Sequence, residues 1–143
     1  ASTIACGETF TVSISITGEV YLYGVIEKKQ VFELRKVPSI KNIISVDCGQ
    51  MHALFLDISG SVFSIGINKS GQLGIGSTEI VIHTHPQRVN LPHIKEISCG
   101  YEFNICLSEN GELYSFGSNS DGQLGLGSDG QFYPSPQLIP SLK

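Results

Sequence analysis

Short runs of alternating apolar and polar residues recur along the chain at matching distances from three Cys-Gly pairs. The pairs are Cys6-Gly7, Cys48-Gly49 and Cys99-Gly100. Apolar residues stand six and eight positions after each cysteine, as Val12 and Ile14, Leu54 and Leu56, and Ile105 and Leu107. An alternation with a period of two predicts strands that are packed on one face, and it does not fit a helix.

A second alternating run follows each of the first ones. Its bulky residues stand fifteen and seventeen positions after the cysteine, as Tyr21 and Tyr23, Phe63 and Ile65, and Tyr114 and Phe116. The two runs are separated by turn sequences that predict hairpins, at Thr17-Gly18, Ser59-Gly60 and Asn110-Gly111. We expect the bulky positions to pack neighbouring sheets face to face. The small Ser64 and Ser115 lie on the opposite strand face, where they suit close packing or a wet channel.

Each unit contains two further predicted strands. A short strand ends two residues before the cysteine, at Ile4, Val46 or Ile97. A last strand is predicted at Pro86–Val89 and at Pro136–Ile139, with the proline at its start, where a missing N–H is tolerated. About four short strands in roughly fifty residues, joined by tight turns, are typical of a propeller blade.

One glycine-rich segment occurs twice, with an offset of 119 − 68 = 51 residues. The two copies read NKSGQLGIGS at Asn68–Ser77 and NSDGQLGLGS at Asn119–Ser128. A single leucine in each copy, Leu73 or Leu124, stands among small residues, so we predict that it is buried and anchors the loop. Glycine adopts positive φ without strain, so we expect it at one or more of Gly122, Gly125 and Gly127.

These motifs, in particular Cys48 to His52, Gly60 to Gly66 and Asn68 to Gly76, resemble the repeat of the regulator of chromosome condensation (RCC1-like) family. The resemblance spans almost the whole chain, closely in the second and third repeats and in part in the first. It implies an all-β partial propeller of three four-stranded antiparallel blades, whereas complete members have seven blades. Two departures stand out. The histidine of the motif occurs only as His52, with Phe10 and Phe103 in its place elsewhere, and the first repeat lacks Gly-Gln-Leu-Gly.

The repeats define one domain over residues 1–143. We place repeat 1 at about 1–40, repeat 2 at about 41–91 and repeat 3 at about 92–143. Because three blades do not easily close a ring, we expect the chain to be a fragment of a longer propeller, in preference to a unit that assembles with other copies.

Composition narrows the range of partners. Charged residues make up 15% of the chain and the net charge is −4, which argues against a general nucleic-acid binder. No apolar run is long enough to span a bilayer, so we expect no membrane partner. The four cysteines form no C-x-x-C motif, and we interpret the three repeated ones as small buried apolar side chains. Free thiols favour an intracellular location, in the cytoplasm or nucleus.

The sequence motifs that could indicate catalysis or ligand binding match their known patterns only in part. Gly125-x-Gly127-x-x-Gly130 matches a dinucleotide fingerprint, but the residues that follow predict no helix. His83, His85 and His93 lack a carboxylate or cysteine at regular zinc spacing. We interpret His52 as a structural residue. The sequence therefore predicts no enzyme, no cofactor and no metal site.

The predicted function is a scaffold for protein–protein interaction. Glycines and apolar anchors recur in the two loops, whereas exposed positions differ, and variable loops on a rigid scaffold carry binding. The predicted partner-binding residues are Lys69, Ser70, Ser120, Asp121, Asp129 and Phe132. The remaining blades of the same propeller, or other copies of the chain, are further expected partners.

The resemblance implies two alternatives to a scaffold. The chain could be part of a guanine nucleotide exchange factor for a Ran-like or other small GTPase. It could also belong to the regulatory propeller of a larger ubiquitin ligase or kinase.

Overall fold

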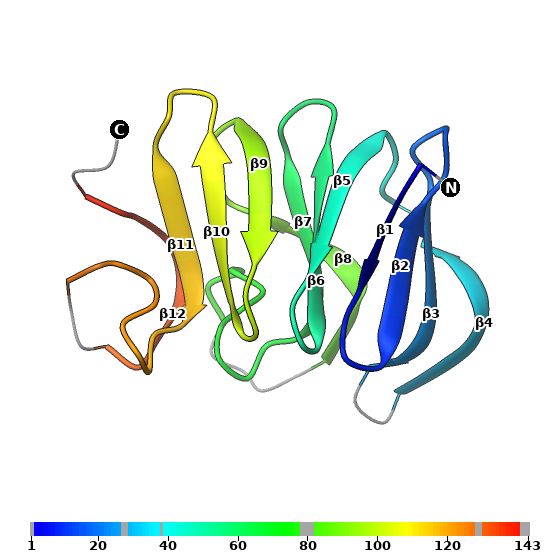
Figure 1. The fold of residues 1–143 in the computed structure, drawn as a ribbon, viewed down its shortest axis with the longest axis horizontal. Helices are drawn as coiled ribbons and strands as arrows, with labels where there is room; N and C mark the ends of the chain where they lie inside the picture. The colour runs from blue at the N-terminus through cyan, green and yellow to red at the C-terminus, as the bar shows by residue number, and fades with distance from the viewer. Residues whose placement is uncertain (1, 27–28, 38, 78–81, 128–129, 141–143) are drawn as a thin grey trace.

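The regular structure consists of three antiparallel sheets of four strands each, which confirms the predicted fold class. The computed structural model describes residues 2–26, 29–37, 39–77, 82–127 and 130–140 (Figure 1).

The sheets follow one another along the chain, and each takes its four strands in sequence order. The first sheet contains β1 (Thr3–Cys6), β2 (Phe10–Ile14), β3 (Val20–Ile26) and β4 (Lys29–Val37). The second sheet contains β5 (Ile43–Cys48), β6 (His52–Asp57), β7 (Val62–Ile67) and β8 (Ile82–Val89). The third sheet contains β9 (Ile94–Cys99), β10 (Phe103–Ser108), β11 (Leu113–Ser118) and β12 (Phe132–Leu138).

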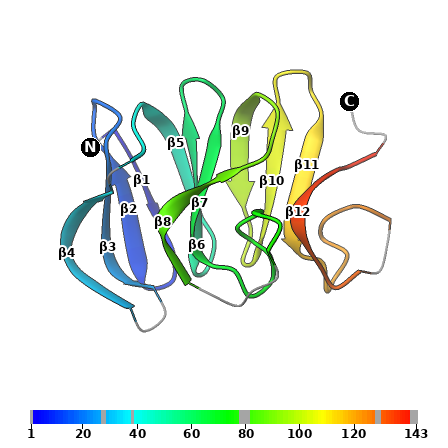
Figure 2. The ribbon, with the colours of Figure 1, turned by 180° about the vertical axis from the view of Figure 1, so that it is seen from behind.

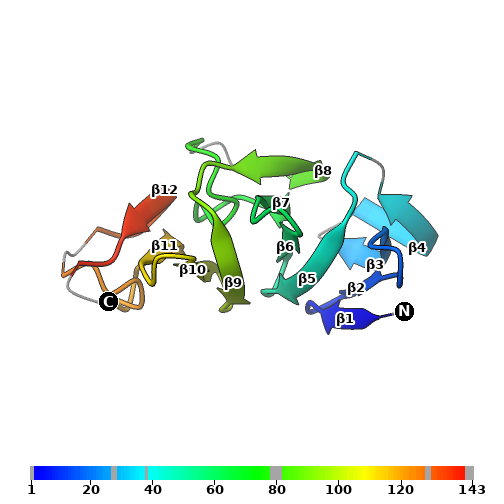
Figure 3. The ribbon, with the colours of Figure 1, turned by 90° about the horizontal axis from the view of Figure 1, so that it is seen from above.

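The sheets are fanned about a common inner side. Seen from above, β1, β5 and β9 lie on this inner side, and β4, β8 and β12 lie on the outer side (Figure 3). Seen from behind, the same outer strands lie in front (Figure 2). The inner strand β5 contacts both β1 and β9. This is the arrangement of adjacent blades in a propeller.

Apolar clusters fill the space on both sides of the central sheet. In β6, Ala53 and Phe55 belong to the cluster shared with the first sheet, whereas Leu54 and Leu56 belong to the cluster shared with the third. All four side chains are buried, so β6 lacks the alternation that β2 shows. The expected face-to-face packing is confirmed at Ile65 and Phe116, which are buried between sheets.

The first repeat departs from this packing. Tyr23, which is equivalent to Ile65 and Phe116, is exposed. Cys6 is also exposed, so its interpretation as a buried side chain is wrong. Cys6 and Ile4 alternate with less exposed neighbours in β1, on a face that none of the other described sheets covers. Cys48 and Cys99, which are half-buried, each pack against an intersheet cluster.

The outer strands begin earlier than predicted. Pro86 lies inside β8, and Pro134 and Pro136 lie inside β12. The pairing of β7 with β8 shifts register between Ser64 and Gly66, and the pairing of β11 with β12 does so at the equivalent place. A proline is tolerated at such an irregularity on an edge strand, because it removes no ladder hydrogen bond.

The first glycine-rich segment is the loop that leaves β7. Leu73 is fully buried there, as predicted. Its carbonyl accepts a hydrogen bond from Ser64 Oγ over 2.8 Å, and its N–H donates to Asn68 Oδ1 over 3.2 Å. The second segment, which leaves β11, repeats both bonds with Ser115, Leu124 and Asn119.

Of the two roles expected for Ser64 and Ser115, the wet channel is wrong, because both side chains are fully buried. Burial fits the alternative of close packing, and each hydroxyl also donates a hydrogen bond that fastens a loop. The glycine prediction is confirmed, since φ is +71° at Gly122, +68° at Gly125 and +69° at Gly127.

We expect Leu124→Ala to lower the free energy of unfolding by about 2–4 kcal/mol, because it leaves a cavity under a loop that has no other apolar anchor of this kind. Urea unfolding followed by circular dichroism measures the change. Ile58→Ala, at a side chain that is 73% exposed, is the control and should cost less than about 0.5 kcal/mol. Equal losses in the two variants would contradict the anchoring role.

Candidate interaction site

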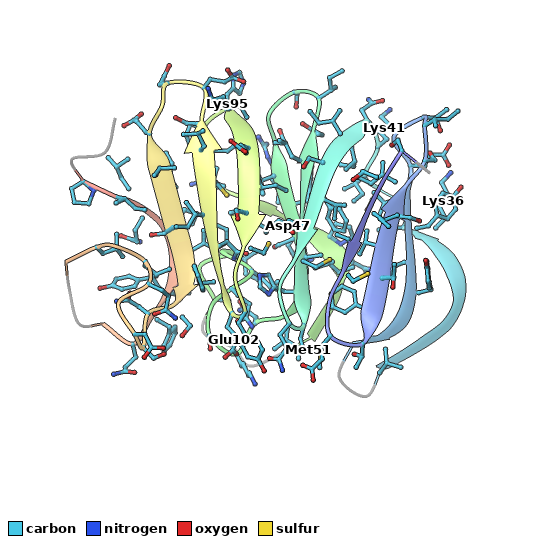
Figure 4. All side chains as sticks on the ribbon, in the orientation of Figure 1. Lys36, Lys41, Asp47, Met51, Lys95 and Glu102 are labelled. Atoms are coloured by element: carbon cyan, nitrogen blue, oxygen red, sulfur yellow. The ribbon has the colours of Figure 1, made fainter. Side chains whose placement is uncertain are left out.

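The three sheets present two ends to solvent. We call one the hairpin end, because it carries the turns β2–β3, β6–β7 and β10–β11 (Figure 1). The opposite end, the loop end, carries the turns between the first and second strands of each sheet together with the glycine-rich loops. Figure 4 shows Lys41 and Lys95 at the hairpin end and Met51 and Glu102 at the loop end.

Two of the predicted partner-binding residues contact the neighbouring sheet. Lys69 Nζ lies 3.7 Å from Glu102 Oε2, and Ser70 Oγ donates to the same oxygen over 3.5 Å. Glu102 belongs to the turn between β9 and β10. Because Lys69 is half exposed in this ion pair, the pair contributes little to stability and remains accessible to a partner.

The other predicted residues lie on the third sheet. Ser120 and Asp121 are exposed on the second glycine-rich loop, where the backbone N–H of Asp121 donates to Gln123 Oε1 over 2.9 Å. Phe132, at the start of β12, is 41% exposed. Asp129 lies outside the described residues. Partner binding by all six positions stays a prediction.

Although the two glycine-rich loops share a sequence, they sit in different surroundings. The N–H of Gly76 donates to the Pro134 carbonyl over 2.9 Å, so the third sheet holds the first loop. Gly71 has a φ of +72°, and a Cβ on it would lie 2.6 Å from Pro134 Cα. A Cβ on the equivalent Gly122 would meet nothing within 4 Å. The first loop is therefore part of an intersheet contact and the second is open.

A buried hydrogen-bond chain joins the second and third sheets. Asn104 Nδ2 donates to the Gln72 carbonyl over 2.6 Å, which turns the Asn104 Oδ1 towards His52. His52 Nε2 donates to that oxygen over 2.7 Å, so the neutral ring carries its proton on Nε2. Burial lowers the pKa of His52 to about 4, and the ring is therefore uncharged at neutral pH.

An aromatic ring four residues after each repeated cysteine explains why a glycine follows that cysteine. A Cβ on Gly49 would lie 2.1 Å from His52 Cε1. Gly7 and Gly100 would clash at the same distance with the rings of Phe10 and Phe103. The position therefore requires a flat ring over a glycine, which phenylalanine satisfies as well as histidine does. This geometry supports the interpretation of His52 as a structural residue.

The thiols of Cys48, Cys99 and Cys106 are poorly suited to nucleophilic or metal-binding chemistry. Burial raises the pKa of Cys48 and of Cys106 to about 12, and it raises the pKa of Cys99 well above its ordinary value. Asp47 strengthens the effect at Cys48 and Cys99, and its carboxylate accepts hydrogen bonds from the N–H of both residues. These thiols stay protonated at neutral pH, whereas nucleophilic attack and metal binding need the thiolate. All four cysteines are free.

Sites for a cofactor or metal have no support in the described part of the chain. No group of three histidine, cysteine, aspartate or glutamate side chains there is placed to hold a metal ion. His85 and His93 are exposed, and the side chain of His83 lies outside the described residues. After Gly130 the chain enters β12 rather than a helix, so the dinucleotide fingerprint lacks its context. Nor do the described residues include a helix that could cross a membrane.

Two residues that join the sheets, Gln72 and Asn104, were not predicted from the sequence. Gln72 recurs as Gln123, so the repeat itself could have marked it. Asn104 stands where the other repeats have Thr11 and Ala53, and no repeated pattern points to it.

Four-stranded antiparallel sheets, fanned side by side and joined by anchored glycine-rich loops, define the chain as part of a β-propeller. The chain belongs to the family described as the regulator of chromosome condensation (RCC1) repeat. One model of this repeat matches residues 59–107 and 110–143, which is more than half of the chain. A second model of the repeat matches residues 43–72 and 94–123.

Individual relatives agree with this assignment. Human Protein RCC2 is 36% identical over 96% of this chain, and the bovine secretion-regulating guanine nucleotide exchange factor is 38% identical over 83% of it. The crystal structure of yeast RCC1 (Prp20) bound to Kap60 superposes on 98% of the chain with a TM-score of 0.85 at 20% identity. That likeness shows the fold.

The chain spans only part of each of these proteins. It covers 29% of human Protein RCC2, 25% of the bovine exchange factor and 37% of the yeast RCC1 chain.

We expect stability to fall as the pH drops from about 6.5 to about 4, in part through His52. The unfolded histidine takes up a proton below its ordinary pKa of 6.5, whereas the buried ring resists protonation down to a pKa of about 4. The contribution is nearly complete at pH 7.5, and about 2.5 kcal/mol of it is lost at pH 4.5. Urea unfolding at pH 7.5 and pH 4.5 measures it.

His52→Phe is the matched variant, because Phe occupies this position in the other two repeats. We expect a lower stability at pH 7.5, since Asn104 loses its donor, but a smaller loss on acidification than in the wild type. An identical pH dependence in both proteins would show that His52 is not the titrating group.

Proposed function

We propose that the chain is part of a non-enzymatic propeller that binds a protein partner through side chains displayed on its loops. The observation that carries this proposal is the pair of glycine-rich loops. One backbone, anchored in the same way twice, displays Lys69 and Ser70 in one copy and Ser120 and Asp121 in the other. Such a scaffold separates the residues that hold the fold from those that face solvent.

The state of the buried polar groups supports a non-enzymatic role. His52 is uncharged and hydrogen-bonded between sheets, and the thiols of Cys48 and Cys106 are protonated at neutral pH. A general base or nucleophile needs a pKa near the working pH and access to a substrate. The free thiols also fit a reducing, intracellular location.

Replacement of the variable loop positions tests the proposal in the full-length protein. We expect a variant with alanine at Lys69, Ser70, Ser120, Asp121 and Asp129 and with Phe132→Ser to lose partners that the wild type captures from cell extract. Recovery should fall by at least about tenfold, which corresponds to loss of one strong contact. Quantitative mass spectrometry measures it, with Asn110→Ala at the hairpin end as control. Full retention of every partner would refute binding through these loops.

A second candidate function is nucleotide exchange, in which the chain would form part of a guanine nucleotide exchange factor for a small GTPase. Its support is the 38% identity to the bovine secretion-regulating guanine nucleotide exchange factor. In addition, a solved relative of the same fold, yeast Prp20p, is described together with its binding properties to Gsp1p and histones.

A nucleotide-release assay decides on this candidate. If the full-length protein is an exchange factor, it should accelerate the release of labelled GDP from one member of a panel of small GTPases by at least about tenfold. Each GTPase alone gives the baseline, and Leu124→Ala serves as the structurally damaged control. Unchanged release across the panel would leave the scaffold as the better description.

A further inference from the structure

A polar groove of about 270 Å³ lies between the first glycine-rich loop, the end of β8 and β12. Arg88 and Asn90 share its lining with Ser135 of β12 and with the loop backbone from Gly74 to Gly76. A hollow of about 200 Å³, which Arg88 and Asn90 also line, extends it. We call the two hollows together the Arg88 groove.

Both walls of the Arg88 groove belong to the second and third repeats, whose outer strands β8 and β12 lie on the outer side of the fan (Figures 2 and 3). The groove is held in shape by contacts within the chain. Gly76 N–H donates to the Pro134 carbonyl over 2.9 Å, which ties the loop to β12. On the other side, a Cβ on Gly74 would lie 3.0 Å from Val89 Cγ1 of β8. The walls therefore need no blade beyond these two.

Arg88 is the only ionisable residue that lines the groove. Its side chain is exposed, and its Nη2 donates to Ser61 Oγ over 3.4 Å. None of the described carboxylates lies within ion-pair distance of the guanidinium. This includes Asp57, whose Oδ1 accepts the N–H groups of Ser59 and Ser61. Because a guanidinium carries five N–H donors, Arg88 keeps donors and an uncompensated charge for another group.

The other two repeats treat this position differently. The strand registers place Lys36 in the first sheet and Leu138 in the third at the position of Arg88. Lys36 Nζ lies 2.7 Å from Glu19 Oε2. Glu19 corresponds to Ser61, since 19 − 6 = 61 − 48 = 13 residues separate each from its repeated cysteine. The second repeat therefore has the cation without the carboxylate that accompanies it in the first.

Neutral hydrogen-bond donors line the groove together with the guanidinium. They are the Asn90 amide and the Ser135 hydroxyl, and no hydrogen bond joins either group to another described residue. Guanidinium, amide and hydroxyl donors are the groups that bind the oxygens of carboxylates and phosphates, and a guanidinium can bind two such oxygens at once. The ion pair of Lys36 with Glu19 shows that an oxyanion fits this position of a blade.

We propose that the Arg88 groove binds an oxyanion on a side chain of a partner protein. The oxyanion is the carboxylate of an aspartate or glutamate or the phosphate of a phosphorylated serine or threonine. It takes the place beside Arg88 that Glu19 has beside Lys36, and it accepts further hydrogen bonds from Asn90 and Ser135. The inference rests on the proposed scaffold function and adds to it a surface that contains none of the six variable loop positions.

Peptide binding to the full-length protein provides the test. The probes are three pools of peptides of about twelve residues, random except for a central phosphoserine, glutamate or glutamine. Peptides that the immobilised protein retains are identified by mass spectrometry, resynthesised and titrated by fluorescence polarisation. We expect binders from the phosphoserine pool, the glutamate pool or both, and none that depends on Arg88 from the uncharged glutamine pool. The pool that yields the tighter binders tells a phosphate from a carboxylate.

Three variants taken from the repeats themselves locate the binding. Arg88→Leu introduces the residue of the third repeat and should weaken binding of the selected peptides by at least about tenfold. Ser61→Glu should do the same, because it supplies within the chain the carboxylate that the first repeat has. Lys36→Leu is the matched control and should have no effect, since this lysine is already paired with Glu19. Thermal unfolding of each variant controls for folding.

The proposal is overturned if neither anionic pool yields a binder. It is also overturned if the selected peptides bind Arg88→Leu or Ser61→Glu as tightly as the wild type. The variant with replaced loop positions keeps every residue of the groove, so it should still bind these peptides. Partner capture that depends on the loops, together with no anionic binder, would refute the groove alone, so its failure and that of the scaffold function are distinguishable.

Discussion

The structure depends on how each glycine-rich loop is closed over its buried leucine. A loop backbone in the interior must satisfy its own N–H and C=O groups. For Leu73 both groups are satisfied by side chains close in sequence, Ser64 and Asn68. The loop then offers the next sheet a smooth surface, since a Cβ on Gly74 would lie 2.6 Å from the Phe116 ring. Loop closure within one blade is thus the condition for packing of the next.

The need to close each loop before the next blade packs explains which hydrogen bonds the polar residues between the sheets make. Asn104 reaches across the sheet interface to the Gln72 carbonyl of the closed loop, and His52 completes that chain from the second sheet. Asp47 in turn receives the N–H of Cys99 from the neighbouring inner strand. These three hydrogen bonds all run between the second and third repeats, so they join two neighbouring blades.

The two ends differ in chemistry. The loop end displays polar and charged side chains on anchored loops, with Lys69 close to Glu102 of the next blade. The hairpin end displays the exposed side chains of Ile16, Ile44 and Ile58. The scaffold function that we propose uses the side chains displayed at the loop end.

The amino-acid sequence by itself determined the strands, the hairpins, the three-blade repeat and the burial of Leu73 and Leu124. These features follow from local patterns, namely a period of two, turn glycines and a repeated loop. Only the tertiary structure decided the partners of Ser64, Asn104 and Lys69, the exposure of Cys6 and the gathering of Ile16, Ile44 and Ile58 around one groove. In most of these cases the neighbour that decides the outcome belongs to another blade or to a loop that folds back onto its own blade. For Cys6, no described sheet covers the side chain. The pattern of residues along one strand carries no information about what lies across the interface between two sheets.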